Sequence, residues 1–239
     1  MPQPFFQFKQ FTVWHNQCAM KVGTDGVLLG TWAPSSENTH TILDIGCGSG
    51  LVALILAQRN PKAHITGIDL DEGAYQQSMY NFRNSPWNNR LEAFHYSLQE
   101  YCSRIPTQFD LIVSNPPYFS KSLKASEQSR TLARHNDHLP LEDLFINSAT
   151  LLKETGSIAL ILPVTDHDNC VKCAQKAGLY CVNYTTVYPK PGVTAKRILM
   201  VFEKNNKPLC IEELTIETIN RGEYTPAFTE LVQDFYLKL

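Results

Sequence analysis

Hydrophobic and polar residues along this chain are grouped in blocks. Short, dense apolar runs are separated by longer segments in which apolar residues recur at helical spacing. The dense runs cover residues 41–45, 64–69, 91–96, 109–114, 157–162, 181–188 and 198–203. Runs this apolar are typical of strands that are covered by helices on both faces. They therefore predict the strands of a largely parallel sheet.

The segments between these runs carry the signals of helix boundaries. The predicted helices span residues 51–59, 71–84, 141–153 and 166–177. The first stops before Pro61, which cannot continue a helix, and the second begins with acids, which are favoured at a helix N-terminus. Gly156 and Gly178 follow the last two as stop signals. The alternation predicts an α/β fold with a doubly wound, mostly parallel seven-stranded sheet.

The two ends of the chain depart from this pattern. Short alternations near residues 6–13 predict a small β-hairpin, residues 25–32 a short helix, and residues 226–239 have the apolar spacing of another helix. A chain of 239 residues is within the range of one large domain. We predict a single domain, residues 1–239, made of an N-terminal extension (1–40), an α/β core (41–204) and a C-terminal appendage (205–239).

Composition limits the class of protein. Hydrophobic residues make up 43% and charged residues 18%, which argues against disorder. The chain has no apolar run of the roughly 18 residues that span a bilayer, and its N-terminus has no signal-peptide pattern. The seven cysteines show no disulfide framework, and Cys170 and Cys173 have no second pair with zinc-site spacing. We expect a cytoplasmic protein without membrane contact or a metal.

A glycine cluster follows the first apolar run. Asp44 precedes Gly46, Gly48 and Gly50, spaced G-x-G-x-G, whereas a dinucleotide-binding loop has the spacing G-x-G-x-x-G. The spacing therefore disfavours a nicotinamide oxidoreductase. Asp69 ends the second run, where a carboxylate can accept both hydroxyls of a ribose. The structural alternative is that the glycines only cap a turn and that Asp69 is a helix N-cap.

The fourth apolar run ends in a second motif, Asn115-Pro116-Pro117-Tyr118. It resembles the N-P-P-Y motif of amino-methyltransferases, and the glycine cluster resembles the cofactor loop of class I S-adenosylmethionine-dependent methyltransferases. An aromatic amine is a poor nucleophile. Acceptors at the Asn115 side chain and the Pro116 carbonyl, held by the stiff proline turn, would hold its two N–H bonds and orient its lone pair. Tyr118 would stack on the base. Alternatively, the prolines simply end a strand.

The whole chain resembles the bacterial valine-tRNA adenine-N6 methyltransferases. The segments that carry this resemblance are residues 8–11, 18–30, 85–87, 132–135 and 224–239. It implies N6-methylation of the adenosine 3′ of the anticodon, with S-adenosylmethionine as cofactor and S-adenosylhomocysteine as product. It also implies that Thr24 and Asp25 close over the methionine end of the cofactor and that Leu70 packs on its adenine. Ser97 is the polar residue nearest to the place where relatives contact that adenine.

Basic residues suggest where RNA binds. The predicted RNA-binding residues are Lys121, Lys124, Arg130, Arg134, His135, Lys196 and Arg197. Because the formal net charge is −2, such a surface must be local. The alternative for each is an ordinary solvated charge. We expect a monomer that acts on tRNA. The alternatives are methylation of guanine-N2 in rRNA, adenine-N6 in DNA or glutamine in protein, or a catalytically silent RNA-binding module.

Overall fold

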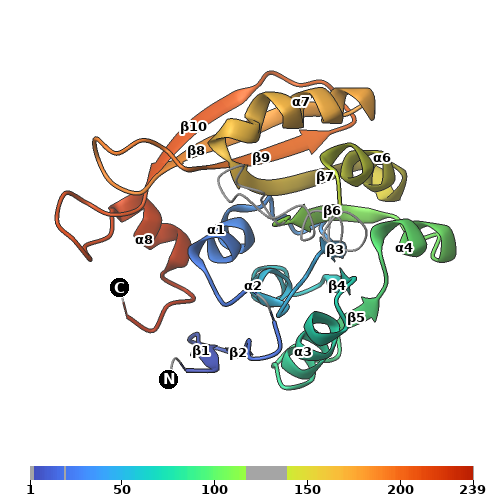
Figure 1. Ribbon diagram of the computed structural model, residues 1–239, viewed down its shortest axis with the longest axis horizontal. Helices are drawn as coiled ribbons and strands as arrows, with labels where there is room; N and C mark the ends of the chain where they lie inside the picture. Colours follow the sequence, from blue (N-terminus) through green and yellow to red (C-terminus); the bar gives the residue numbers. More distant parts are fainter. Residues whose placement is uncertain (1–2, 19, 117–138, 239) are drawn as a thin grey trace, which may run out of the picture.

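An eight-stranded sheet lies between two layers of helices in the computed structural model, which describes residues 3–18, 20–116 and 139–238 (Figure 1). The strands are β3 (Thr41–Ile45), β4 (His64–Asp69), β5 (Leu91–His95), β6 (Phe109–Ser114), β7 (Leu152–Pro163), β8 (Tyr180–Tyr188), β9 (Arg197–Glu203) and β10 (Cys210–Thr215). Their order is β10-β8-β9-β7-β6-β3-β4-β5. Only β9 is antiparallel to its neighbours, β7 and β8.

All seven predicted strands are present, which confirms the predicted α/β fold with a mostly parallel sheet. The predicted number of seven strands is wrong, because β10 pairs with β8 and adds an eighth at the sheet edge. This strand lies in the segment predicted as the C-terminal appendage. Its first four residues are exposed and only Leu214 is buried, so it lacks the apolar density of the other strands.

Helices cover both faces of the sheet (Figure 1). One layer contains α1 (Thr24–Trp32), α2 (Leu51–Arg59), α3 (Glu72–Arg83) and α8 (Pro226–Val232); the other contains α4 (Leu98–Arg104), α6 (Leu141–Leu151) and α7 (His167–Lys176), the last preceded by the short turn η1 (Val164–Asp166). Successive strand residues serve opposite layers: Leu111 and Val113 join one apolar cluster and Ile112 the other. Burial on both faces explains why the strands read as continuous apolar runs.

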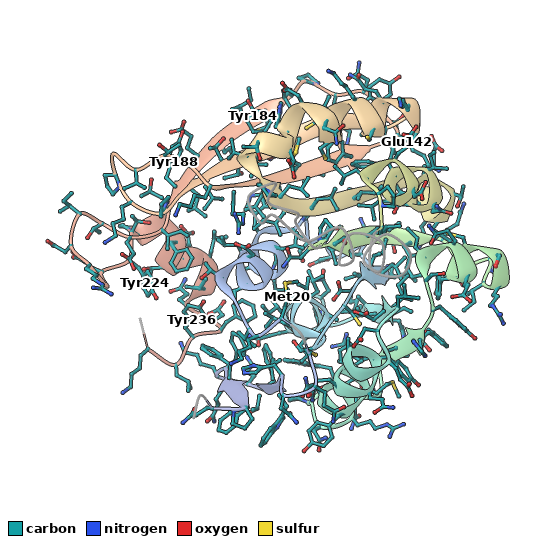
Figure 2. All side chains as sticks on the ribbon, in the orientation of Figure 1. Met20, Glu142, Tyr184, Tyr188, Tyr224 and Tyr236 are labelled. Carbon is teal, nitrogen blue, oxygen red and sulfur yellow. The ribbon has the colours of Figure 1, made fainter. Side chains whose placement is uncertain are left out.

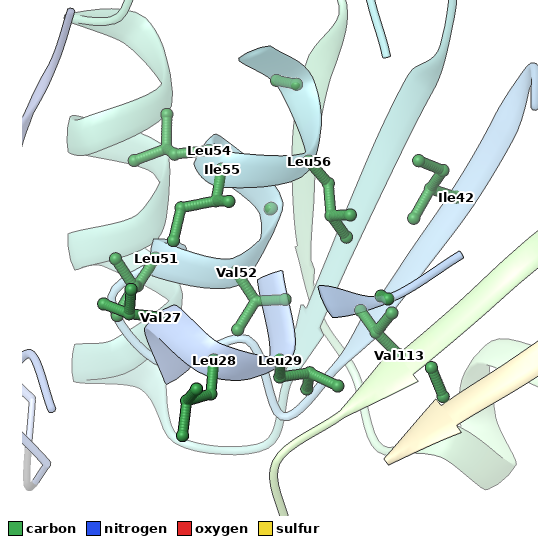
Figure 3. Packing of buried hydrophobic residues seen from close by; sticks show 14 of the residues in the cluster. Val27, Leu28, Leu29, Ile42, Leu51, Val52, Leu54, Ile55, Leu56 and Val113 are labelled. Atoms are coloured by element: carbon green, nitrogen blue, oxygen red, sulfur yellow. The ribbon is translucent and has the colours of Figure 1, made fainter. Parts of the chain in front are cut away.

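The helices α1 and α2 pack closely together (Figure 3). A Cβ atom on Gly26 would lie 2.9 Å from Leu51, and one on Gly30 would lie 2.9 Å from Ile55. At Gly30 a side chain would meet the Cβ of Ile55, so glycine is needed there for the helices to approach this closely, and the first turn of α1 lies against the first turn of α2. That contact places the start of α1 beside the glycine cluster that precedes α2.

The two ends of the chain pack on each other, the N-terminal hairpin also on α3 and the C-terminal end also on α2. The hairpin of β1 (Phe5–Gln7) and β2 (Thr12–Trp14) forms as predicted. The Lys9 amide donates to the Phe235 carbonyl at 2.8 Å. The helix predicted over residues 226–239 is too long, because α8 ends at Val232. Phe235, beyond the helix, is buried in the same apolar cluster as Phe8 and Phe11. Tyr236 lies against this cluster (Figure 2).

Two boundaries also differ near Gly156. The predicted helix over 141–153 ends at Leu151, and Gly156 lies within β7 instead of stopping a helix. A Cβ atom there would lie 2.8 Å from the Phe109 carbonyl oxygen, so the glycine allows β7 to approach β6 closely. The described part of the chain has no helix that is long and apolar enough to cross a membrane. The single-domain division stays a prediction.

Candidate cofactor and catalytic site

The candidate site lies where β3, β4 and β6 end side by side. Ile45, the last residue of β3, pairs with Ile68 of β4 and with Ser114, the last residue of β6. Neighbouring strands lie roughly 5 Å apart, so the loops that follow them are neighbours too. This is the edge at which open α/β sheets bind ligands. The structure thus brings together the glycine cluster, Asp69 and Asn115.

The glycine loop has a backbone that other residues rarely adopt. Gly46, Gly48 and Gly50 have φ angles of 69°, 56° and 78°. The amides of Gly46 and Cys47 both donate to the Ile68 carbonyl, at 2.9 and 3.0 Å. A Cβ atom on Gly46 or Gly48 would have no described atom within 4 Å. The loop is therefore pinned to β4 while part of its backbone faces open space that a ligand can approach.

Asp69 links this loop to the next one. Its Oδ2 accepts from the Gly48 amide at 2.8 Å, and its Oδ1 accepts from the Asp71 amide at 2.9 Å. A carboxylate has about four lone-pair sites, so each oxygen can still accept a ribose hydroxyl. Asp71, whose Oδ1 accepts from the Ala74 amide at 2.7 Å, caps α3. This hydrogen bond excludes the N-cap alternative for Asp69.

Burial raises the pKa values of the two acids in the site. Asp44 is 1% exposed, and burial, followed by the charge of Asp69, raises its pKa to about 7. Burial also raises the pKa of Asp69. Asp44 Oδ2 accepts from the Ala53 amide at 3.1 Å and so ties β3 to the start of α2. Among described residues, Asp44 pairs with no basic side chain, so a cationic ligand nearby would favour its ionised form.

The reactive motif begins at the same edge. The Ser114 hydroxyl donates to the Ile45 carbonyl at 2.8 Å, which joins the ends of β6 and β3. Asn115 is half-buried and Pro116 is buried. Pro117 and Tyr118 lie outside the described residues, as do Lys121, Lys124, Arg130, Arg134 and His135. The roles given to all of these residues stay predictions.

The start of α1 lies at the rim of the site. Thr24 is exposed, and Asp25 accepts a hydrogen bond from the Arg197 guanidinium, with 2.7 Å between Oδ2 and Nε. A residue predicted to contact the cofactor thus pairs with one predicted to contact RNA. Lys196, next to Arg197, is exposed. The sequence contained no local signal for this ion pair, because its partners are 172 residues apart.

Ser97 has a local structural role. Its hydroxyl accepts from the Glu100 amide at 3.2 Å, and its own amide donates to the Glu100 carboxylate at 3.0 Å. This capping box begins α4, which the apolar pattern did not predict although Ser-x-x-Glu is its signature. The contact of Ser97 with the cofactor adenine stays a prediction. Across the sheet edge, His95 Nε2 lies 2.9 Å from the Leu70 carbonyl oxygen and steadies the loop after Asp69.

Known proteins are similar to this chain in sequence and in fold. Residues 22–163 match the family described as "Methyltransferase small domain". A protein from Bacteroides thetaiotaomicron named tRNA1(Val) (adenine(37)-N6)-methyltransferase is 48% identical, and the alignment covers 100% of both chains. The chain belongs to this methyltransferase family. A protein of the same name from Flavobacterium johnsoniae is 43% identical over 98% of this chain and 100% of its own length.

The class I methyltransferase fold is also found in a solved structure. A predicted O-methyltransferase from Agrobacterium tumefaciens has a TM-score of 0.70 at 18% identity, covering 88% of this chain and 96% of the other. In the methyltransferase described here, the "Methyltransferase small domain" match begins just before α1 and ends with β7, so it spans the glycine loop, Asp69 and Asn115. Among the described residues, no group of three or more His, Cys, Asp or Glu side chains could hold a metal ion.

Proposed function

We propose that this methyltransferase transfers the methyl group of S-adenosylmethionine to N6 of an adenosine in tRNA, the adenosine 3′ of the anticodon of valine tRNA. The observation that carries the proposal is the meeting of the glycine loop, Asp69 and the Asn115 corner at one sheet edge. The proposed substrate is supported by 48% identity, over the whole chain, to a protein whose name specifies that reaction.

The residues at this edge fit the cofactor. The open backbone of Gly46 and Gly48 leaves room for it, and the Asp69 oxygens keep capacity for the ribose hydroxyls. Leu70 is 52% exposed, so its side chain is accessible to an adenine ring. The ionised form of Asp44 would favour a cation, and S-adenosylmethionine supplies a methyl group bound to a positively charged sulfur.

The chain's own part in the reaction is to orient the amine. We assign the Asn115 side-chain oxygen and the Pro116 carbonyl as acceptors for the two amine hydrogens, so that the nitrogen lone pair points toward the methyl group. S-adenosylmethionine, when bound, would supply its methyl group to the amine nitrogen with loss of its C–S bond, and the amine would give up one proton to water. Tyr118 would stack on the base. Thr24, Asp25 and Ser97 remain further predicted contacts of the cofactor.

The tRNA would reach this edge along basic residues. Lys196 is exposed at the start of β9, at the same edge as Asn115, because β9 runs antiparallel to β7. Lys121, Lys124, Arg130, Arg134 and His135 follow the reactive motif in the sequence and complete the predicted surface. Contacts of this kind position a nucleic acid through its phosphates. A monomeric state and a cytoplasmic location stay predictions.

The test is methylation of total tRNA with labelled S-adenosylmethionine, followed by nucleoside analysis by mass spectrometry. We expect N6-methyladenosine in valine tRNA from wild-type protein, and much less from the Asn115→Ala variant. Label in N2-methylguanosine or in methylglutamine would contradict the assigned substrate but keep the reactive motif. If no nucleic acid or protein is labelled although the protein binds S-adenosylhomocysteine, the catalytically silent RNA-binding module is favoured.

A further inference from the structure

The ion pair between Asp25 and Arg197 joins two distant segments at the rim of the proposed site. Asp25 lies in the first turn of α1, and Arg197 is the first residue of β9. The two side chains are only 27% and 32% exposed, so the pair is partly shielded from water. A charge-assisted hydrogen bond of 2.7 Å in such a place is stronger than an exposed surface pair.

Asp25 is well placed to affect the cofactor site. The neighbouring Gly26 packs on Leu51, which directly follows Gly50 of the glycine loop. The first turn of α1 is also held by apolar packing, because Gly26 and Val27 are buried, whereas its N-cap residue, Gly23, has no side chain that could cap the helix. The polar tether of the turn is therefore Asp25, and its described partner is Arg197.

Arg197 is held on the sheet side of the pair. It lies opposite Pro163, the last residue of β7, and its Nη1 donates to the Lys196 carbonyl at 3.1 Å. The guanidinium is thus fixed at two of its nitrogens. Lys196 differs, because it is exposed and its side chain has no ion pair within the described ranges.

We propose that Arg197 is a positioning residue for cofactor binding, which holds Asp25 and with it the first turn of α1 against the glycine loop. This inference rests on the proposed function. It divides two adjacent cations between two tasks: Arg197 supports the cofactor side, and Lys196 faces the tRNA. Loss of the guanidinium would leave a partly buried carboxylate without its counter-charge, and the turn would move toward water.

The experiment compares Arg197→Ala, Arg197→Lys and Lys196→Ala by calorimetry with S-adenosylhomocysteine and by tRNA binding at several salt concentrations. We expect Arg197→Ala to weaken S-adenosylhomocysteine binding about 10-fold, the scale of one lost charge-assisted contact. The lysine variant should recover part of the loss. The slope of log tRNA affinity against log salt should stay unchanged in both Arg197 variants, whereas Lys196→Ala should reduce it by about one phosphate contact.

A double-mutant cycle tests whether Arg197 acts through Asp25. The loss in Asp25→Asn/Arg197→Ala should not exceed the larger single loss, and additive losses would overturn the proposal. In steady-state assays, KM for S-adenosylmethionine should rise while kcat stays close to wild type. If Arg197→Ala does not fold, Arg197→Gln, which removes the charge but keeps a long side chain, takes its place in the cycle.

The outcomes also separate this inference from the proposed function. Unchanged S-adenosylhomocysteine affinity in a folded Arg197→Ala variant, or a reduced salt slope in it, contradicts the positioning role while leaving methylation of tRNA untouched. Wild-type protein that does not bind S-adenosylhomocysteine contradicts the proposed function itself.

Discussion

The cofactor side and the substrate side of this site are built in different ways. On the cofactor side, main-chain amides of the glycine loop and of Asp71 bind the Ile68 carbonyl and the Asp69 carboxylate. On the proposed substrate side, the side chains of Asn115 and Lys196 come from separate strand ends, and the Pro116 carbonyl is the main-chain group assigned there. The proposed cofactor side is therefore held mainly by backbone geometry, whereas the proposed substrate side depends more on individual side chains.

The largest effect should come from removing the Asn115 side chain, which is assigned to hold the reacting amine. Asn115→Ala should lower the methylation rate about 10²–10³-fold, the usual scale for one preorganised polar contact in a transition state. Cofactor affinity should stay nearly intact, because the lost oxygen serves the substrate amine. Single-turnover rates with tRNA and calorimetry with S-adenosylhomocysteine would measure both. A variant that methylates as fast as wild type would remove Asn115 from the mechanism.

Asp69→Ala should weaken cofactor binding, whereas Asn115→Ala should lower the methylation rate. Loss of the charged acceptor should weaken both cofactor and product by roughly 10- to 100-fold. The variant also removes the partner of the Gly48 amide, so Asp69→Asn is the matched control for the loss of charge alone. Calorimetry that shows unchanged affinity in Asp69→Ala would place Asp69 outside the cofactor site.

Local pattern was enough to predict that the glycine loop, Asp69 and Asn115 follow strand ends, but not which distant side chains pair beside them. The glycine spacing and the acid at the end of β4 are short-range signals, since backbone turns need particular residues at particular offsets. The Asp71–Ala74 hydrogen bond assigns the helix cap to Asp71 and so removes the N-cap alternative for Asp69, whose contact with the ribose stays a proposal. The pairing of Asp25 with Arg197 depends on the order of strands in the sheet, which residue spacing does not contain.

The errors at the C-terminal end have the same physical origin. Strand β10 is at an edge and buries little, so its apolar content is too low to be recognised in the sequence. The helix expected over 226–239 ends at Val232, and beyond it Phe235 is buried in the core while the Tyr236 ring lies against Phe6 and Phe8 of the hairpin region. Tertiary burial outweighed helical spacing in this segment.

The next prediction concerns pH and tests the role of the buried Asp44 in cofactor binding. Burial raises the pKa of Asp44 to about 7, so the free protein holds a proton there below that pH. A cationic cofactor favours the ionised carboxylate, so its affinity should rise with pH, by up to about tenfold per unit below pH 7, and level off above it. Calorimetry from pH 6 to 8 would measure this.

The control for this pH effect is Asp44→Asn, which cannot titrate. Its cofactor affinity should be weaker and nearly independent of pH over the same range. Because the folded pKa lies above the unfolded value of 3.8, the contribution of Asp44 to the stability of the free protein should be lost as pH rises toward about 7. Equal pH slopes in the two proteins would assign the titration to another group.

The smallest effect should come from Ser97, where a structural role and a ligand role make different predictions. Its hydroxyl and amide close a capping box with Glu100 at the start of α4. Ser97→Ala should therefore lower the free energy of unfolding by about 1 kcal/mol, the usual contribution of an N-cap. Ser97→Asp should restore stability, because an aspartate also accepts from the amide at the third helical position. Urea unfolding would measure both variants.

If Ser97 only caps the helix, S-adenosylhomocysteine affinity should be the same in wild type and Ser97→Ala, since the sheet edge that carries Asp69 is held by other hydrogen bonds. A loss of affinity in Ser97→Ala without a loss of stability would instead assign the hydroxyl to the cofactor adenine.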